Sequence, residues 1–244
     1  MGFFEQIIET AAQYEDAAVI SLTLGWHASF VVSSDGRWGM GCVPSSLKEP
    51  HTARESHTNH LLRSSLVRLA ELIVSPFPQE FAAATAACSA LMPFPDGGFR
   101  LDDLMPCARG DRVAVLGYER ELIPMMRDWG WKLAVFDDME KRPDCFPQKD
   151  FPRGAEDAEW VWLSPEAIRD RWLISVSETL HRKKGCFLQG PGLPWIKEAF
   201  SERGVTHLIS PAAKGEAESI RCYLSAGGSP WRSPDLEWKV YSTS

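Results

Sequence analysis

The segment 187–195, Phe-Leu-Gln-Gly-Pro-Gly-Leu-Pro-Trp, strongly constrains the fold of this chain. A short apolar run enters a Gly-Pro-Gly turn, and Pro194 follows at a position where a helix could begin. A parallel strand passes into a helix in this way in open α/β sheets, which bind ligands beyond the carboxyl ends of their strands. Gly190 and Gly192, on either side of Pro191, would let backbone amides approach an anion, although a purely structural turn explains the residues equally well.

The second half of the chain alternates short apolar runs with helical segments. Strands are expected at 113–116, 132–136, 160–163, 186–189, 207–210 and 237–241. Helices are expected between them at 119–129, 165–181, 194–203 and 215–226, with an irregular connection over 145–158. This alternation predicts a Rossmann-like, doubly wound and mainly parallel sheet.

The first part of the chain has the pattern of a small α+β domain. Helices are expected at 3–14, 62–73 and 81–91, and strands at 18–24, 28–33 and 38–43. Asp35-Gly36 predicts a hairpin turn, and Gly39 and Gly41 leave room for a close backbone neighbour. A break rich in proline and glycine follows at 93–98, so we expect one domain over 1–108 and a second over 109–244.

Composition and charge exclude several classes of protein. Hydrophobic residues make up 44% of the chain and charged residues 24%, as in ordinary globular proteins, and a net charge of −7 argues against nucleic-acid binding. The sequence contains neither a signal peptide nor an apolar run long enough to span a membrane. Six widely spaced cysteines favour reduced thiols in the cytoplasm. We therefore expect a cytoplasmic protein without nucleic-acid or membrane partners, and leave a homo-oligomer open.

The turns that follow the expected parallel strands carry the candidate ligand-binding residues. Gly117 follows the first strand, but the Gly-x-Gly-x-x-Gly fingerprint is absent, which argues against conventional NAD binding. Asp137 or Asp138 stands where a ribose hydroxyl could be bound, or is simply a solvated strand end. Ser164 either caps the next helix or lines the crevice. The predicted ligand-binding residues are Gly117, Asp137, Ser164, Gly190, Pro191, Gly192 and Ser210.

Three histidines in the first domain form a candidate metal site. His51, His57 and His60 lie within ten residues, with Glu55 among them and Cys42 shortly before. Imidazole and carboxylate groups ligate zinc and other first-row transition metals. The alternative is an exposed polar loop. The chain has no nucleophile elbow, Walker loop or His-Glu-x-x-His motif, so no catalytic residue is predicted.

The order of these features resembles a bacterial and archaeal family of unknown function, the putative heavy-metal chelation proteins. The resemblance is carried by the glycine-rich hairpin, the alanine-rich helix, the segment Val115-Leu116-Gly117 and the turn over 188–194. It implies a first domain similar to the N-terminal domain of enolase, a Rossmann-like second domain, and a ligand crevice between them.

The function expected from these features is the binding of a small anionic or metal-linked ligand in that crevice, connected with metal homeostasis. The cofactor would be a transition metal or a nucleotide-like ligand. One alternative is a transferase-type enzyme that uses a nucleotide-like cofactor, which a deep pocket holding a side chain of shifted pKa would favour. Another alternative is an interaction module that binds no small ligand.

Overall fold

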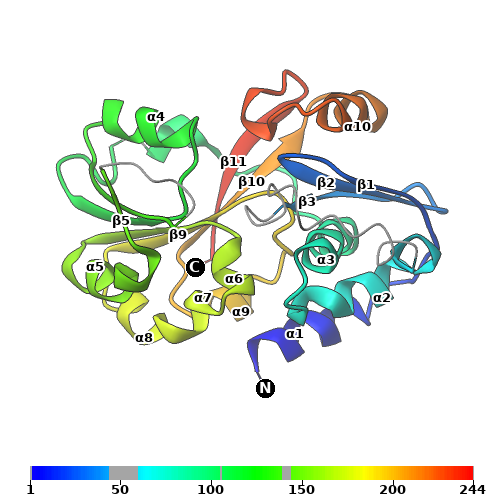
Figure 1. Ribbon diagram of the computed structural model, residues 1–244, viewed down its shortest axis with the longest axis horizontal. Helices are drawn as coiled ribbons and strands as arrows, with labels where there is room; N and C mark the ends of the chain where they lie inside the picture. The colour runs from blue at the N-terminus through cyan, green and yellow to red at the C-terminus, as the bar shows by residue number, and fades with distance from the viewer. Residues whose placement is uncertain (1, 44–59, 105, 139–143, 244) are drawn as a thin grey trace. The chain divides into compact units, whose positions relative to one another are not determined.

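The computed structural model of the protein describes residues 2–43, 60–104, 106–138 and 144–243. Contacts within the chain divide it into two compact units, whose elements are labelled in Figure 1. Unit 1 comprises Met1–Asp96, Gly190–Ala199 and Ser210–Trp238, and unit 2 comprises Gly97–Gln189, Phe200–Ile209 and Lys239–Ser244. The expected division after residue 108 placed both later segments of unit 1 in the second domain, whereas their contacts lie mainly in unit 1.

Unit 1 contains a three-stranded antiparallel sheet in the order β1-β2-β3. Its strands are β1 (Val19–Leu24), β2 (Ala28–Ser33) and β3 (Trp38–Cys42), as predicted. The helices of unit 1 are α1 (Phe3–Ala11), α2 (Leu66–Ala70), α3 (Pro78–Leu91) and α10 (Ala217–Ser225). Short 3₁₀ turns lie at η3 (Leu61–Arg63), η4 (Glu71–Val74) and η7 (Pro230–Arg232).

The prediction of a single helix over 62–73 is wrong, because two serines interrupt it. Ser64 is extended, with φ −95° and ψ 173°. Ser65 bridges to Ala18 beside β1 and then caps α2, where its hydroxyl oxygen accepts from the backbone N–H of Arg68 at 3.5 Å. Serine favours such capping positions because its side chain replaces a missing helical hydrogen bond.

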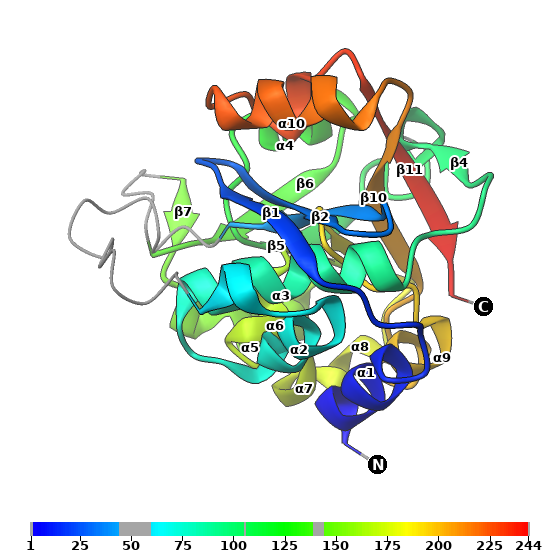
Figure 2. The same ribbon diagram turned by 90° about the vertical axis from the view of Figure 1, so that its right-hand side faces the viewer.

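Both faces of the small sheet are covered by helices, α3 on one and α10 on the other (Figures 1 and 2). A Cβ at Gly39 would lie 2.3 Å from the carbonyl oxygen of Ala86, and one at Gly41 would lie 2.5 Å from that of Ala82. The two glycines therefore let α3 approach the strand, as the sequence predicts. On the opposite face Phe30 and Met40 pack in one cluster with Ala28, Ile220, Leu224 and Leu236.

The larger sheet has eight strands in the order β4-β11-β10-β9-β8-β5-β6-β7. Its strands are β4 (Phe99–Arg100), β5 (Arg112–Leu116), β6 (Lys132–Phe136), β7 (Cys145–Phe146), β8 (Trp160–Leu163), β9 (Gly185–Gln189), β10 (His207–Ala213) and β11 (Leu236–Ser242). The six neighbouring strands β10, β9, β8, β5, β6 and β7 pair in parallel. At the other edge, β4 and β11 pair antiparallel with each other. This is the strand order of a Rossmann fold, so the predicted doubly wound sheet is confirmed.

In unit 2, α4 covers one face of this sheet and α5 to α8 cover the other (Figures 1 and 2). The helices are α4 (Leu122–Asp128), α5 (Phe151–Asp157), α6 (Glu166–Arg169), α7 (Trp172–Ser175) and α8 (Ser177–Leu180). The remaining elements are η5 (Leu101–Leu104), η6 (Gln148–Asp150) and α9 (Lys197–Ser201), whose last residues belong to unit 2. No helix in the described ranges is long and apolar enough to cross a membrane.

Two predictions for unit 2 are wrong. The connection over 145–158 is not irregular, because it contains β7, η6 and α5. The single helix expected over 165–181 is three short helices. α6 and α7 are separated at Arg171, which adopts φ 60°, a left-handed conformation that a continuous helix cannot contain. α7 and α8 are separated at Val176, which has φ −104° and ψ 6°.

Candidate functional site at the ends of β5 and β8

The strand order of unit 2 places a topological switch point between β5 and β8. β5 pairs with β6 on one side and with β8 on the other. The chain leaves β5 towards β6 and leaves β8 towards β9, so the two connections diverge. Open α/β sheets bind ligands at this point, outside the carboxyl ends of the strands. Gly117 directly follows β5, and Ser164 directly follows β8.

Gly117 and Ser164 lie against each other at this switch point. Gly117 adopts φ +89°, and a Cβ added there would lie 2.7 Å from Ser164 Oγ and 2.8 Å from Ser164 Cβ. The backbone hydrogen bonds of the sheet continue as far as these residues. The Gly117 N–H donates to the Phe136 carbonyl and the Ser164 N–H donates to the Leu116 carbonyl, each at 3.0 Å. A glycine is therefore required here both by the backbone and by the serine beside it.

The Ser164 hydroxyl is buried without a hydrogen-bond partner. The residue is 7% exposed, and its Oγ has no partner among the described residues. The helix-capping alternative is not realised, because Pro165 occupies the N-cap position of α6 and no backbone N–H reaches Ser164 Oγ. A buried hydroxyl left unpaired costs about 1–3 kcal/mol. The role expected for Ser164 in ligand binding stays a prediction.

Asp137 fixes the turn that contains Gly117. Its Oδ2 accepts a hydrogen bond from the backbone N–H of Tyr118 at 2.6 Å. The neighbouring Asp138 accepts from the backbone N–H of Gln148 at 2.9 Å. Both carboxylates therefore hold loops, Asp137 half-buried and Asp138 exposed to solvent. The ribose-binding role expected for Asp137 or Asp138 stays a prediction.

Gln189 is a buried polar residue that the sequence analysis did not single out. It ends β9, is 2% exposed, and its Oε1 accepts from the indole N–H of Trp162 at 3.2 Å. Trp162 belongs to an aromatic cluster with Trp131 and Phe187, whose ring centroids lie 5.2–6.1 Å from one another. The signal in the sequence was a single polar side chain at the end of an otherwise apolar strand.

The Gly-Pro-Gly turn is packed within unit 1. Gly190, Pro191 and Gly192 are all buried. Gly192 adopts φ +84°, and a Cβ there would lie 2.7 Å from Thr85 Cβ and 2.8 Å from Gly41 Cα. This packing accounts for Gly192 without a ligand, so binding by the turn stays a prediction. Ser210, 7% exposed in β10, also has its contacts mainly in unit 1.

Part of the candidate metal site can be placed. His51 and His57 lie outside the described residues, whereas His60 Nε2 lies 3.5 Å from Glu80 Oε1. The described residues contain no group of three or more histidine, cysteine or acidic side chains that could hold a metal. His60 and Glu80 alone fall short of the three or four protein ligands of a zinc site.

Two of the buried thiols, Cys88 and Cys186, are unsuited to metal binding. Burial raises the pKa of the Cys88 thiol to about 12 and also raises that of Cys186. A metal binds the thiolate, and sites that use one lower the pKa of the thiol. Cys88 and Cys186 are therefore core side chains.

Comparison with known proteins identifies the family. A family model described as "Putative heavy-metal chelation" matches residues 101–235, more than half of the chain. The chain belongs to this family. A second model with the same description matches residues 5–92. No curated protein matches the chain.

Two solved structures with unknown function, both from the family matched over 101–235, share the fold of this member. A protein from Pyrococcus horikoshii is 16% identical with a TM-score of 0.76, and the match covers 98% of each chain. A protein from Desulfitobacterium hafniense is 19% identical with a TM-score of 0.78, covering 99% of this chain and 98% of its own. At these identities the likeness shows the fold alone.

Proposed function

We propose that the protein binds a small anionic or metal-linked ligand at the switch point of unit 2, and that this ligand is connected with metal homeostasis. The observation that carries the proposal is the buried Ser164 hydroxyl, which has no partner among the described residues. The Rossmann strand order supports a ligand at this place, and the family description supports a link to metals.

The arrangement around Ser164 suits an oxygen-bearing ligand. A serine hydroxyl can donate one hydrogen bond to a carboxylate or phosphate oxygen and accept others. Gly117 has no side chain, so the ligand could reach the backbone at the end of β5. The Tyr118 amide is held by Asp137, which keeps the turn in one conformation before any ligand arrives. A preformed turn lowers the entropic cost of binding.

Native mass spectrometry of the freshly isolated protein would identify any small molecule that co-purifies. Thermal-shift measurements with nucleotides, S-adenosylmethionine and metal chelates would follow, since a specific ligand raises the melting temperature by mass action. We expect Ser164→Ala to abolish the shift given by the best compound. Ser201→Ala removes an exposed serine of the same unit and is the matched control. An equal shift in wild type and Ser164→Ala would exclude this site.

Metal binding by the histidines is a second candidate, favoured by the family description and by the pairing of His60 with Glu80. His51 and His57 would have to supply the further ligands. Elemental analysis of protein purified without chelators tests it. We expect metal in near-stoichiometric amount that falls when the three histidines are replaced by glutamine. Metal content unchanged by these substitutions would remove the candidate.

A further inference from the structure

A pocket on the α5 face of unit 2 extends along the strands of the large sheet. It has a volume of about 650 Å³ and is lined by residues of β5, β6, β7, η6 and α5. It runs from Arg112 and Lys132, the first residues of β5 and β6, to Phe136, the last residue of β6, whose carbonyl accepts from the Gly117 N–H. Lys132 lies four residues, roughly 13 Å, along β6 from the end beside Gly117. Its volume is that of a small-molecule site.

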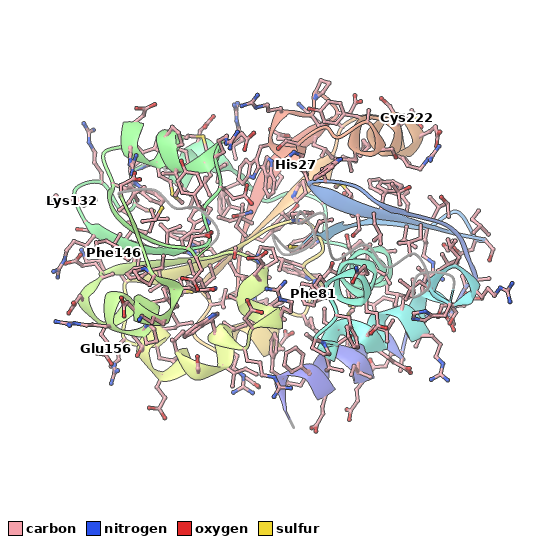
Figure 3. The ribbon with its side chains drawn as sticks, in the orientation of Figure 1. His27, Phe81, Lys132, Phe146, Glu156 and Cys222 are labelled. Atoms are coloured by element: carbon pink, nitrogen blue, oxygen red, sulfur yellow. The ribbon has the colours of Figure 1, made fainter. Side chains whose placement is uncertain are left out.

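The pocket offers an apolar and aromatic lining that the helices leave uncovered. Leu133 and Ala134 of β6 are half-buried although they belong to an inner strand, and Phe146 is 53% exposed. Figure 3 labels Phe146 together with Lys132, which also lines the pocket. Exposed apolar surface in a concave site is unfavourable in water and marks a place for a ligand.

Gly154 allows an aromatic wall to form in this pocket. A Cβ at Gly154 would lie 2.0 Å from Cζ of Phe136, so only glycine lets α5 pass over that ring. The ring centroid of Phe136 lies 5.5 Å from that of Phe146 and 5.7 Å from that of Phe151. Glycine inside a helix costs about 1 kcal/mol relative to alanine. Phe151 is fully buried and Phe136 is 4% exposed, so Phe146, which is 53% exposed, offers most of the ring surface to which a further aromatic ring can pack.

Two cationic side chains of the pocket have no carboxylate within ion-pair distance among the described residues. They are Lys132 on β6 and Arg153 on α5. Arg153 has Asp150 three residues before it and Asp157 four residues after it, the spacing at which helical ion pairs form, yet it pairs with neither.

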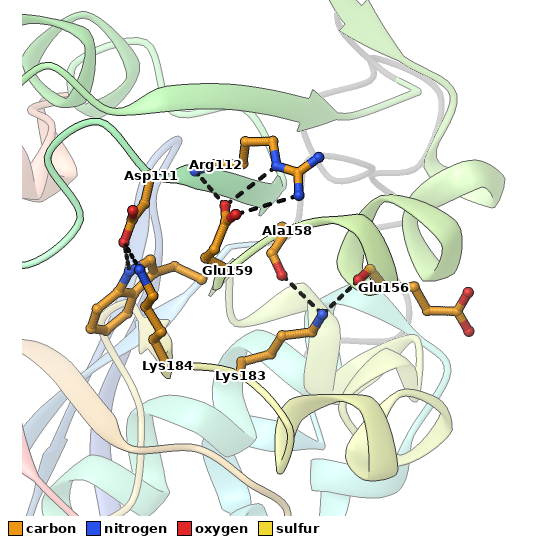
Figure 4. Close-up of polar contacts among 8 residues, drawn as sticks. Asp111, Arg112, Glu156, Ala158, Glu159, Lys183 and Lys184 are labelled. Atoms are coloured by element: carbon orange, nitrogen blue, oxygen red, sulfur yellow. Dashed lines mark hydrogen bonds and ion pairs between the residues drawn. The ribbon is translucent and has the colours of Figure 1, made fainter.

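Arg112, the third cation of the pocket, is already neutralised. Its guanidinium lies 3.3 Å from Glu159 Oε1, and its backbone N–H donates to Glu159 Oε2 at 2.7 Å (Figure 4). The two remaining cations reach the pocket from different elements, Lys132 from β6 and Arg153 from α5, and the nearest acidic influence on Lys132 is Asp111, which lies beyond ion-pair distance. A carboxylate placed between them would gain two charge-assisted hydrogen bonds.

We propose that this pocket binds a small aromatic carboxylate. The ring system packs against Phe136, Phe146 and Ala134, and the carboxylate accepts from Arg153 and Lys132. The site is independent of the ligand proposed at Ser164.

Isothermal titration with three naphthalene probes tests the proposal: 2-naphthoate, the neutral 2-naphthamide and the cationic 2-naphthylmethylammonium. We expect 2-naphthoate to bind most tightly, because Arg153 and Lys132 attract its carboxylate. Asp150 and Asp157 also line the pocket and would make the cation bind best if they set the charge of the site. Arg153→Gln combined with Lys132→Gln should weaken naphthoate binding about tenfold or more. Arg182→Gln, an exposed cation of unit 2 outside the pocket, and Ser164→Ala should leave the affinity unchanged.

A second variant tests the apolar part of the pocket. Ala134→Leu would fill space beside Phe136, whose side chain lies on the same face of β6, and should abolish binding of all three probes, with circular dichroism confirming that the variant is folded. If Ala134→Leu does not fold, the variant that combines Arg153→Gln with Lys132→Gln still decides the test. The proposal is overturned if no probe binds or if the cation binds as tightly as naphthoate. It is also overturned if the affinity for naphthoate is unchanged by the Arg153 and Lys132 substitutions.

Discussion

Gly117 and Ser164 meet at the ends of two adjacent parallel strands, and the serine fills the space that a Cβ on the glycine would need. The virtual Cβ lies 2.7 Å from the hydroxyl oxygen and 2.8 Å from the serine Cβ, closer than atoms in contact approach. The identity of each residue is thus coupled to the other, and the coupling can be measured.

Gly117→Ala should destabilise the protein by about 2–5 kcal/mol in urea unfolding. The left-handed φ costs a non-glycine residue about 1–2 kcal/mol, and crowding against Ser164 adds about 1–3 kcal/mol. Gly110→Ala is the matched control, because Gly110 has φ +82° and nothing within 4 Å of a Cβ. It should show the backbone cost alone.

A double-mutant cycle separates the two costs at Gly117. Ser164→Gly removes both crowding atoms and should recover most of the difference between Gly117→Ala and Gly110→Ala. Ser164→Ala should recover little, because its Cβ remains 2.8 Å from the new methyl group. Equal destabilisation by Gly117→Ala and Gly110→Ala would show that the predicted crowding does not exist.

Ser164→Ala alone should leave the free energy of unfolding unchanged or raise it by about 1 kcal/mol, since it removes a buried hydroxyl that has no partner among the described residues. Ser29→Ala is the contrast. Ser29 is fully buried, and its hydroxyl donates to the Ala82 carbonyl at 2.6 Å, so its loss should cost about 1 kcal/mol. Chemical denaturation of both variants checks the difference, and similar losses would mean that Ser164 has a partner after all.

Gly192→Ala should destabilise unit 1 by about 1–3 kcal/mol more than Gly36→Ala. Both glycines have positive φ, +84° and +86°, but only Gly192 is closed in, by Thr85 and Gly41. Thermal unfolding of the two variants measures the difference. If Gly192→Ala were the milder change, the turn would not be packed as described, and its glycines would again need a ligand to explain them.

Stability should fall as the pH is lowered through the histidine range, because burial lowers the pKa of His207 below its usual 6.5. The unfolded chain binds a proton near pH 6.5, whereas the folded chain resists protonation until a lower pH. Unfolding is therefore favoured as the pH falls through 6.5, and the effect levels off below the folded pKa. His207→Gln should flatten the profile between pH 7.5 and 5.5. His181→Gln, an exposed control, should not.

Sequence patterns predicted most strands of this protein because local apolar runs decide them. Three of the strands in unit 2, at 132–136, 160–163 and 186–189, lie within one residue of the observed β6, β8 and β9. The bounds of the helices were harder to predict, because breaks within the helical segments do not follow from the spacing of apolar residues. Arg171 breaks the expected helix over 165–181 through its own left-handed backbone, which no pattern of apolar residues encodes.

The candidate site was only partly predictable. Ser164 and Gly117 could be placed in turns that follow strands, but their contact depends on β5 and β8 lying side by side. The sequence order alone does not give that adjacency, because β6 and β7 come between the two strands in the chain. The sequence of the Gly-Pro-Gly turn indicated that Gly192 matters for the structure. Its packing against Thr85 and Gly41 could not be predicted, because these residues lie more than a hundred positions earlier in the chain.

The discontinuity of unit 1 has a consequence for synthesis on the ribosome. Ile220 and Leu224 of α10 cover Phe30 and Met40 of the small sheet, nearly two hundred residues after those strands are made. That apolar face of the nascent sheet therefore stays exposed until α10 has been synthesised. We expect chaperone dependence during translation, and no single cut in the gene would yield either unit intact.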